Sequence, residues 1–97
     1  MEKPVIRVDW DNVDWKSVDE AALAIMLLGL HDGWRTWKGF DWGILNRLYE
    51  QGFITDPKSK TKSVIFTESG LEESQRLFEK LFRLRLESLD PKGVSEL

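Results

Sequence analysis

The sequence predicts a small, mainly α domain that carries one β-hairpin. Three observations support this fold class. The stretch 21–30 is apolar nearly all round, as a buried helix is. Residues 53–66 read as two short apolar runs joined by a polar, lysine-rich turn. Residues 68–89 place apolar side chains at helical spacing, which predicts a long closing helix.

Size and composition limit what the chain can be. Ninety-seven residues suffice for one hydrophobic core and not for two, so a single domain over residues 1–97 is expected. A hydrophobic content of 41% and no cysteine point to a globular chain without disulfides or thiolate metal sites. The N-terminus lacks the apolar run of a secretory signal, and the longest apolar run is about half of the roughly 20 residues of a membrane span. We therefore expect a soluble, cytoplasmic protein.

The first 16 residues have two interpretations. Residues 4–10, PVIRVDW, alternate like a strand, with Ile6, Val8 and Trp10 on one side. They could add a third strand beside the hairpin. The alternative is an extended arm that packs Trp10 onto the body or onto a partner. Residues 1–16 are thus predicted as an N-terminal arm or an edge strand.

The first helix is predicted over residues 18–30. Ser17 and Glu20 have the spacing of a capping box, in which each side chain bonds the other residue's backbone N–H. The helix should stop near His31, which is followed by Asp32 and Gly33. A histidine at this place meets unpaired carbonyls and the negative end of the helix dipole, so a structural role explains it.

The second helix is predicted over residues 42–51, after a link at 34–38 with room for one or two helical turns. Asp41 is its expected cap, and Gly52 suits the left-handed conformation that ends a helix. Its inward face is predicted from side chains that share one side: Trp42, Leu45, Leu48 and Tyr49. Its outward residues would then be Gly43, Asn46, Arg47 and Glu50.

The hairpin at 53–66 leads into a last helix that Thr67 should cap. This helix carries more apolar positions, among them Leu84, Leu86 and Leu89, than a lone surface helix requires. We therefore expect it to form a homodimer, to which the tryptophan-rich N-terminus could contribute. Residues 90–97 are expected to be a frayed tail.

Helix, strand, turn, strand and capped helix from Ile44 to Gly70 follow in the order of a winged helix. From Leu45 onward the chain resembles winged-helix transcription regulators, in which a leucine-rich recognition helix leads into a strand and the return strand ends in a cap like Phe66–Gly70. It departs from them before Asp41, where only WRTWKGF fills the place of a positioning helix.

A second resemblance covers about two thirds of the chain. The runs DEAALAIMLLGLHDGW (19–34), WKGFDWGILNRLYEQGFITDP (37–57) and KSVIFTESGLEESQRLFEKLF (62–82) resemble an uncharacterised bacterial family, the domain of unknown function 6429. This resemblance implies no known activity.

Charge is unevenly distributed and suggests one candidate surface. Residues 1–34 hold three Lys/Arg against seven Asp/Glu, whereas residues 35–62 hold six against three. In the middle third, side chains that could contact nucleic acid are Arg35, Lys38, Asn46, Arg47, Lys58, Lys60 and Lys62. Asn and Arg can read base edges, and lysines can meet phosphates. The simpler interpretation is that these lysines keep an exposed hairpin soluble, and the net charge of −3 disfavours polyanions.

Five tryptophans within the first 42 residues suggest another surface. Most should pack around the helix at 18–30, but a domain of this size cannot easily bury them all. An exposed Trp on the arm or on the link would anchor a partner. The predicted protein-interface residues are Trp10, Trp34, Trp37, Leu84, Leu86 and Leu89.

No catalytic motif, metal-ligand set or cofactor pattern is predicted. His31 has no Cys or His companion for a metal, and Asp9, Asp11, Asp14 and Asp19 lack the glycine and terminal glutamate of a calcium loop. We therefore expect a non-enzymatic protein-interaction module without cofactors. Its partner would be a second copy or another protein. The alternative is a DNA-binding transcriptional regulator that uses the helix at 42–51 and the lysines at 58–62.

Overall fold

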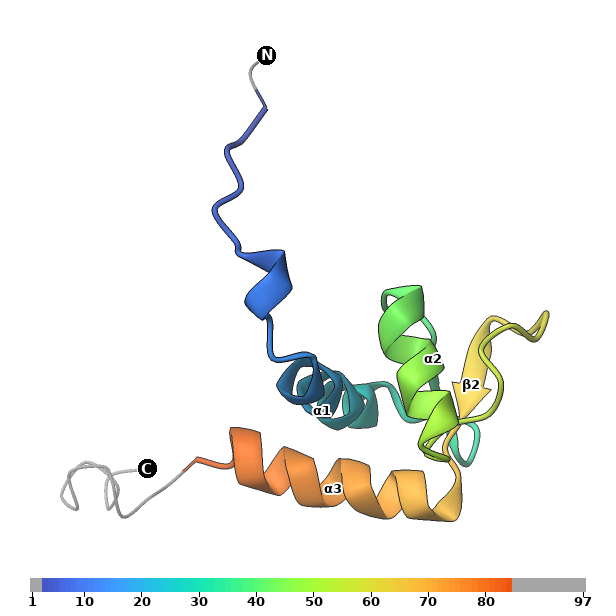
Figure 1. Cartoon of the computed structure of the whole chain (residues 1–97). Helices are drawn as coiled ribbons and strands as arrows, with labels where there is room; N and C mark the ends of the chain where they lie inside the picture. The colour runs from blue at the N-terminus through green and yellow to red at the C-terminus, as the bar shows by residue number, and fades with distance from the viewer. Residues whose placement is uncertain (1–2, 85–97) are drawn as a thin grey trace, which may run out of the picture.

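Three α-helices and a two-stranded antiparallel sheet make up residues 3–84, the part of the chain that the computed structural model describes (Figure 1). The expected mainly helical, winged-helix-like fold is confirmed. In chain order the elements are η1 (Trp10–Asn12), α1 (Trp15–Met26), η2 (Leu27–Gly29), β1 (Arg35–Trp37), α2 (Trp42–Glu50), β2 (Ser63–Ile65) and α3 (Glu68–Phe82), where η marks a 3-10 helix.

Helix α1 begins earlier than predicted because Asp14 caps it. The Asp14 carboxylate accepts a hydrogen bond from the Ser17 backbone N–H at 3.2 Å and another from the Ser17 hydroxyl at 2.6 Å. Ser17 therefore lies inside the first turn, and the predicted capping box of Ser17 and Glu20 is wrong. Hydrogen bonds from Ser17 also lower the pKa of Asp14.

Strand β1 stands where a short helical turn was predicted at 34–38, so that prediction is wrong. A tight turn at Asp32 and Gly33, both with positive φ, turns the chain into the strand. Thr36 then points inward, paired with Val64 of β2, and its buried hydroxyl donates to the carbonyl of Met26. Its pairing with β2 makes this segment a strand, and Thr36 is buried between the partly exposed Arg35 and the exposed Trp37, as strand alternation requires. The strand that pairs with β2 therefore comes from here and not from residues 4–10.

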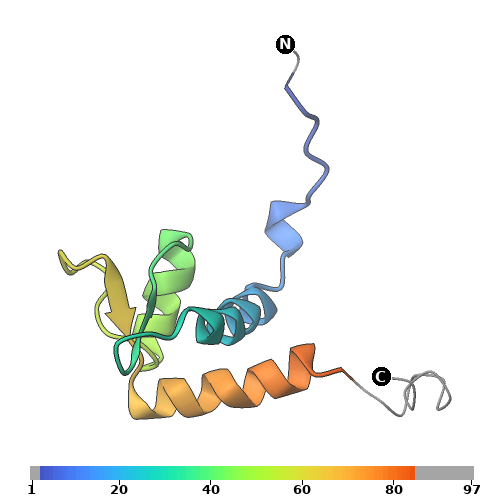
Figure 2. The ribbon, with the colours of Figure 1, turned by 180° about the vertical axis from the view of Figure 1, so that it is seen from behind.

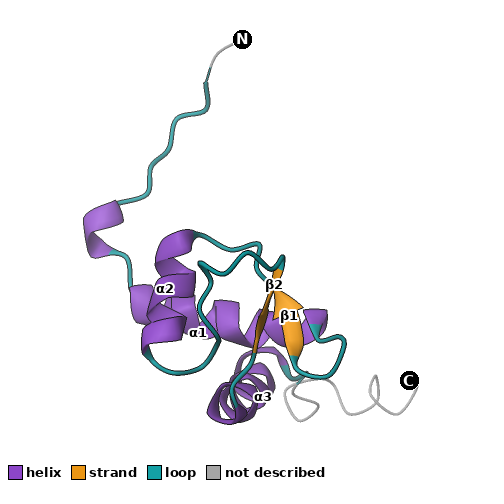
Figure 3. Cartoon of the chain, turned by 90° about the vertical axis from the view of Figure 1, so that its right-hand side faces the viewer, coloured by secondary structure: helices purple, strands orange, loops and turns teal. Residues whose placement is uncertain are grey.

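The chain leaves α2 and turns back as predicted. Gly52 has φ +81° and Phe53 donates from its N–H to the Leu48 carbonyl at 3.0 Å, which confirms the glycine stop. Ile54 forms a single antiparallel bridge with Phe66. The outgoing half of the predicted hairpin is thus one bridge, and β2 pairs mainly with β1 (Figure 3). We call residues 56–62, which join the two halves, the wing.

The core lies where the three helices and the sheet meet. The Ser74 hydroxyl of α3 donates to the Leu23 carbonyl of α1 at 2.7 Å in the buried crossing of the two helices. Gly70 lets α3 approach the backbone of Phe53, because an added Cβ would lie 1.8 Å from the Phe53 oxygen. Thr67 caps α3 as predicted. The buried core cluster contains Leu23, Ala24, Met26, Leu45, Leu48, Ile54, Val64, Phe66 and Leu77.

Two predicted inward side chains of α2 are on the surface. Trp42 and Tyr49 are 55% and 45% exposed, whereas Leu45 and Leu48 are buried and Ile44 packs against the core. The apolar arc of this helix is wider than the arc that the core covers, so its edge stays open. The prediction was therefore wrong for both aromatic residues.

Helix α3 ends at Phe82, and Leu84 follows in the exposed chain beyond it. The prediction that the helix continues through residues 83 and 84 is wrong, because Arg83 is already in an extended conformation. Residues 85–89 of the predicted helix, and the tail at 90–97, lie outside the described residues. Within residues 3–84 no helix is long and apolar enough to cross a membrane.

The N-terminal residues form an arm and not a strand. Residues 3–9 have no regular secondary structure and lead away from the body, as two opposite views show (Figures 1 and 2). At the base of the arm the ring of Trp10 stacks on that of Trp15, with centroids 6.5 Å apart. We call residues 3–13 the arm.

Candidate functional site

Helix α2 lies between α1 and the wing, and its two flanks differ in chemistry. On the flank that faces α1, the Arg47 guanidinium binds both carboxylate oxygens of Asp19, at 2.6 and 2.9 Å. Asp19 is only 4% exposed. The hydrogen bond to Asp19 raises the pKa of Arg47, and its guanidinium also lies 5.3 Å from the centroid of the Trp15 ring. The expectation that Arg47 points outward is therefore wrong.

The other flank carries Trp42, Asn46 and Tyr49 at positions i, i+4 and i+7. This spacing places the three side chains on one side of the helix. Beside them, the Lys38 ammonium lies 5.9 Å from the centroid of the Trp42 ring and donates to the carbonyls of Ser59 and Thr61, at 2.7 and 2.9 Å. Lys38 thereby links the start of α2 to the wing.

The wing presents three exposed lysines in a segment held by polar contacts. The Asp56 carboxylate accepts from the Lys58 N–H at 2.9 Å. The hydroxyls of Ser59 and Thr61 share a hydrogen bond of 2.8 Å, and Thr61 donates to the Ser63 carbonyl at 2.9 Å. These contacts hold the backbone and leave the ammonium groups in solvent. We define the α2–wing face by Lys38, Trp42, Asn46, Tyr49, Lys58, Lys60 and Lys62.

The structure brings only part of the predicted nucleic-acid set together. Lys38 reaches the wing through the carbonyls of Ser59 and Thr61, and Asn46 shares a side of α2 with Trp42. Arg35 lies on the sheet, where it donates to the Ser63 hydroxyl at 3.3 Å. Arg47 lies on the opposite flank of α2, bound to Asp19. The two arginines are thus already engaged within the domain.

The predicted protein-interface residues are exposed but lie apart. Trp10 belongs to the arm, Trp34 and Trp37 to the two ends of β1, and Leu84 to the chain after α3. The Trp37 ring covers Gly29, where an added Cβ would lie 2.4 Å from it. Leu86 and Leu89 lie outside the described residues. The sequence analysis missed Trp42 and Tyr49, although their i, i+7 spacing signalled a shared side.

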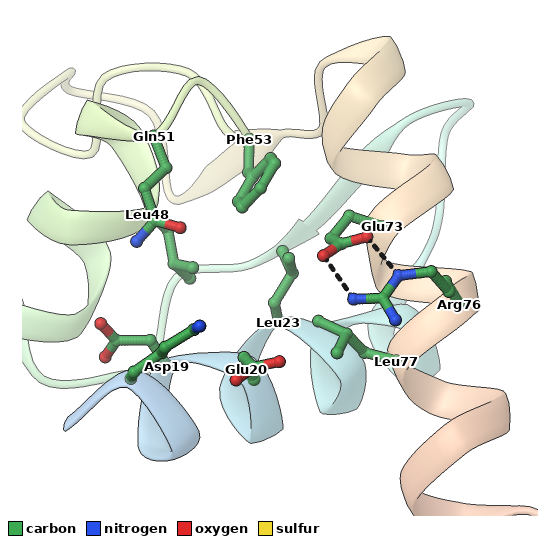
Figure 4. Close-up of a pocket in the computed structure, with 10 residues that line it drawn as sticks. Asp19, Glu20, Leu23, Leu48, Gln51, Phe53, Glu73, Arg76 and Leu77 are labelled. Atoms are coloured by element: carbon green, nitrogen blue, oxygen red, sulfur yellow. Dashed lines mark hydrogen bonds and ion pairs between the residues drawn. The ribbon is translucent and has the colours of Figure 1, made fainter. Parts of the chain in front are cut away.

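A second feature is a pocket of about 180 Å³ between α1, α3 and the end of α2 (Figure 4). Leu23, Leu48, Phe53 and Leu77 supply its apolar lining. At its edge Glu73 accepts two hydrogen bonds from Arg76, at 2.6 and 2.7 Å, and this contact lowers the pKa of Glu73. Ligand pockets commonly measure about 300–1,000 Å³, so this one is the size of a single side chain.

Residues 3–84 contain no group of three or more His, Cys, Asp or Glu side chains that could hold a metal ion. The His31 ring nitrogen Nδ1 lies 2.7 Å from the Gly29 carbonyl at the end of η2, in the structural position expected for it.

The fold and this surface define a small winged-helix-like domain. The chain belongs to the family described as "Domain of unknown function (DUF6429)", which matches residues 14–84. It is also similar to the "Uncharacterized protein y4hR" of Sinorhizobium fredii (strain NBRC 101917 / NGR234), with 46% identity over 70 residues that cover 72% of this chain and 95% of that protein. No solved structure matches. The family resemblance expected from the sequence is confirmed, and it assigns no activity.

Proposed function

We propose that this domain is a protein-interaction module that binds another polypeptide through the α2–wing face. The observation that carries the proposal is the exposure of Trp42 and Tyr49 on one side of α2. Trp and Tyr are enriched among the residues that contribute most to binding energy, because each buries a large apolar area with few rotatable bonds. Two such rings along one helix make a compact anchor.

The polar residues of the face support a specific contact. Asn46 lies between the two aromatic side chains and offers both a donor and an acceptor. Lys38 is already held by two carbonyl groups, so presenting its charge to a partner costs little further side-chain entropy.

A DNA-binding regulator is the second candidate. The observation that favours it is the exposure of Lys58, Lys60 and Lys62 on one projecting wing. The engagement of Arg47 by Asp19 and the net charge of −3 weigh against it, because a groove-reading helix needs free donors and a weak repulsive field.

A displayed library of random peptides would test the first proposal. We expect selected peptides to lose at least tenfold in affinity, measured by fluorescence anisotropy, when the target carries Trp42→Ala and Tyr49→Ala. Trp34→Ala is the matched control, since it removes an exposed Trp at the end of the sheet farther from the wing, and it should leave affinity unchanged. Failure to select any peptide, or equal loss in the control, would contradict the proposal.

Titration of random-sequence duplex DNA would test the second candidate. Binding at low salt that weakens at higher salt, and weakens further in a Lys58→Ala/Lys60→Ala/Lys62→Ala variant, would support DNA binding through the wing. Absence of binding at low salt would remove it.

A further inference from the structure

The end of the arm and the start of α1, residues 8–15, form a largely exposed acidic and aromatic segment, which follows the basic residues Lys3 and Arg7. Residues 8–15, VDWDNVDW, hold three aspartates, two tryptophans and no basic residue. Trp10 is 59% exposed, and Val5, Ile6 and Val8 are exposed as well. An extended run of apolar side chains that the body leaves uncovered is typical of a segment with a binding partner.

The α2–wing face has the complementary chemistry. The Lys38 ammonium lies 5.9 Å from the centroid of the exposed Trp42 ring and also binds the backbone of the wing, where Lys58, Lys60 and Lys62 are exposed. Opposite charges and uncovered aromatic groups thus occur on two parts of the same chain. Complementary potentials of this kind direct association and fix its register.

The two parts are kept apart within one molecule. At the base of the arm, Trp15 lies against Arg47 on the α1-facing flank of α2, whereas the wing adjoins the opposite flank through Lys38 and Trp42. Figures 1 and 2 show the arm and the wing leaving the body in different directions, with α2 between them. The arm of one chain would have to cross α2 to reach its own wing.

We infer that the arm of one copy docks on the α2–wing face of a second copy. This inference rests on the proposed function and names its partner. Asp9 and Asp11 of the arm meet the wing lysines, while Val8 and Trp10 cover the rings of Trp42 and Tyr49. The contact joins two unlike surfaces, and when each copy gives one arm and receives the other, the two equivalent contacts close an isologous dimer with two-fold symmetry.

Charge reversal in full-length protein tests the inference. The arm variant is Asp9→Lys/Asp11→Lys, and the wing variant is Lys58→Glu/Lys60→Glu/Lys62→Glu. Sedimentation velocity over micromolar concentrations should show wild-type protein associating above the 11.3 kDa of one chain, less so at high salt. Each variant alone should stay monomeric, because its arm and face then carry like charges. An equimolar mixture of the two should associate again, since both contacts are restored between unlike copies.

Circular dichroism establishes that each variant is folded before it is mixed. A monomeric wild-type protein at all concentrations, variants that associate like the wild type, or a mixture that stays monomeric would overturn the inference. If self-association fails but peptides still bind through Trp42 and Tyr49, the protein-interaction module is supported and its partner is not a second copy. If neither self-association nor peptide binding is observed, the proposed function is wrong.

Discussion

Each flank of α2 has a basic side chain beside a tryptophan, but the two basic side chains have different partners. Toward α1, Arg47 is bound to the buried Asp19 and covers Trp15. Toward the wing, Lys38 lies beside Trp42, and that ring remains open to solvent. A cation next to an exposed tryptophan occurs on both sides, but only Arg47 is also bound to a buried carboxylate. Residue type on a helix therefore does not by itself mark a binding surface.

On the flank that faces α1, which we call the closed flank, the buried Asp19 carboxylate fixes the position of Arg47. Removing charge from water costs free energy that a paired, hydrogen-bonded partner must offset, so neither Asp19 nor Arg47 can be released cheaply. The open flank has no such constraint, and its rings can exchange water for another molecule. This difference predicts which substitutions harm folding and which harm binding.

The largest effect is expected where α3 packs against the segment that follows α2. Gly70→Ala would place a Cβ 1.8 Å from the carbonyl oxygen of Phe53, so α3 must move away from the core. We expect the free energy of unfolding, measured by urea denaturation, to fall by about 3 kcal/mol or more. Gly39→Ala is the control, because nothing lies within 4 Å of its added Cβ, and its change should be under about 0.5 kcal/mol. Equal effects at the two sites would contradict the close contact.

Arg47→Ala should have the next largest effect. It leaves the Asp19 carboxylate buried without its partner, and we expect a loss of about 2–3 kcal/mol in urea denaturation. The loss is at the lower end for buried pairs because the Arg47 side chain is 37% exposed. The double variant Asp19→Leu/Arg47→Leu should recover part of it, since no charge is then stranded. A double variant less stable than Arg47→Ala would contradict this reasoning.

Trp42→Ala on the open flank should barely affect folding. The ring is more than half exposed and contributes chiefly a contact with Lys38, so the expected loss is under about 1 kcal/mol. The same variant should weaken peptide binding and self-association, in contrast to Arg47→Ala measured at a temperature where it remains folded. A loss of stability as large as that of Arg47→Ala would show that the two flanks are alike.

The smallest effect concerns pH and the edge of the pocket. Because Arg76 lowers the pKa of Glu73 below its ordinary value of 4.5, the folded state favours the ionised carboxylate. That stabilisation is present above pH 4.5 and is lost as the pH falls through the lowered value. Compared with Glu73→Gln, wild-type protein should be more stable at pH 7 by under about 1 kcal/mol, and the difference should shrink toward pH 3. A difference that grows on acidification would have the wrong sign.

Much of the fold was predictable because its signals are local. Gly52, Thr67 and Asp41 act through bonds to residues a few positions away, so their types and spacing announce the ends of helices. The strand at 35–37 was missed for the opposite reason. Its formation depends on pairing with Ser63–Ile65, which the intervening helix separates from it in sequence.

The candidate site likewise depends partly on local sequence signals and partly on contacts between distant residues. The sequence alone determined the mainly helical class, the order of the elements, the family and the lysine-rich turn, because periodicity and capping need only neighbouring residues. Only the tertiary structure decided that Asp19 takes Arg47 away from the surface and that the core leaves Trp42 and Tyr49 uncovered. Exposure is set by what the rest of the chain places against a side chain, and that depends on contacts between residues far apart in the sequence.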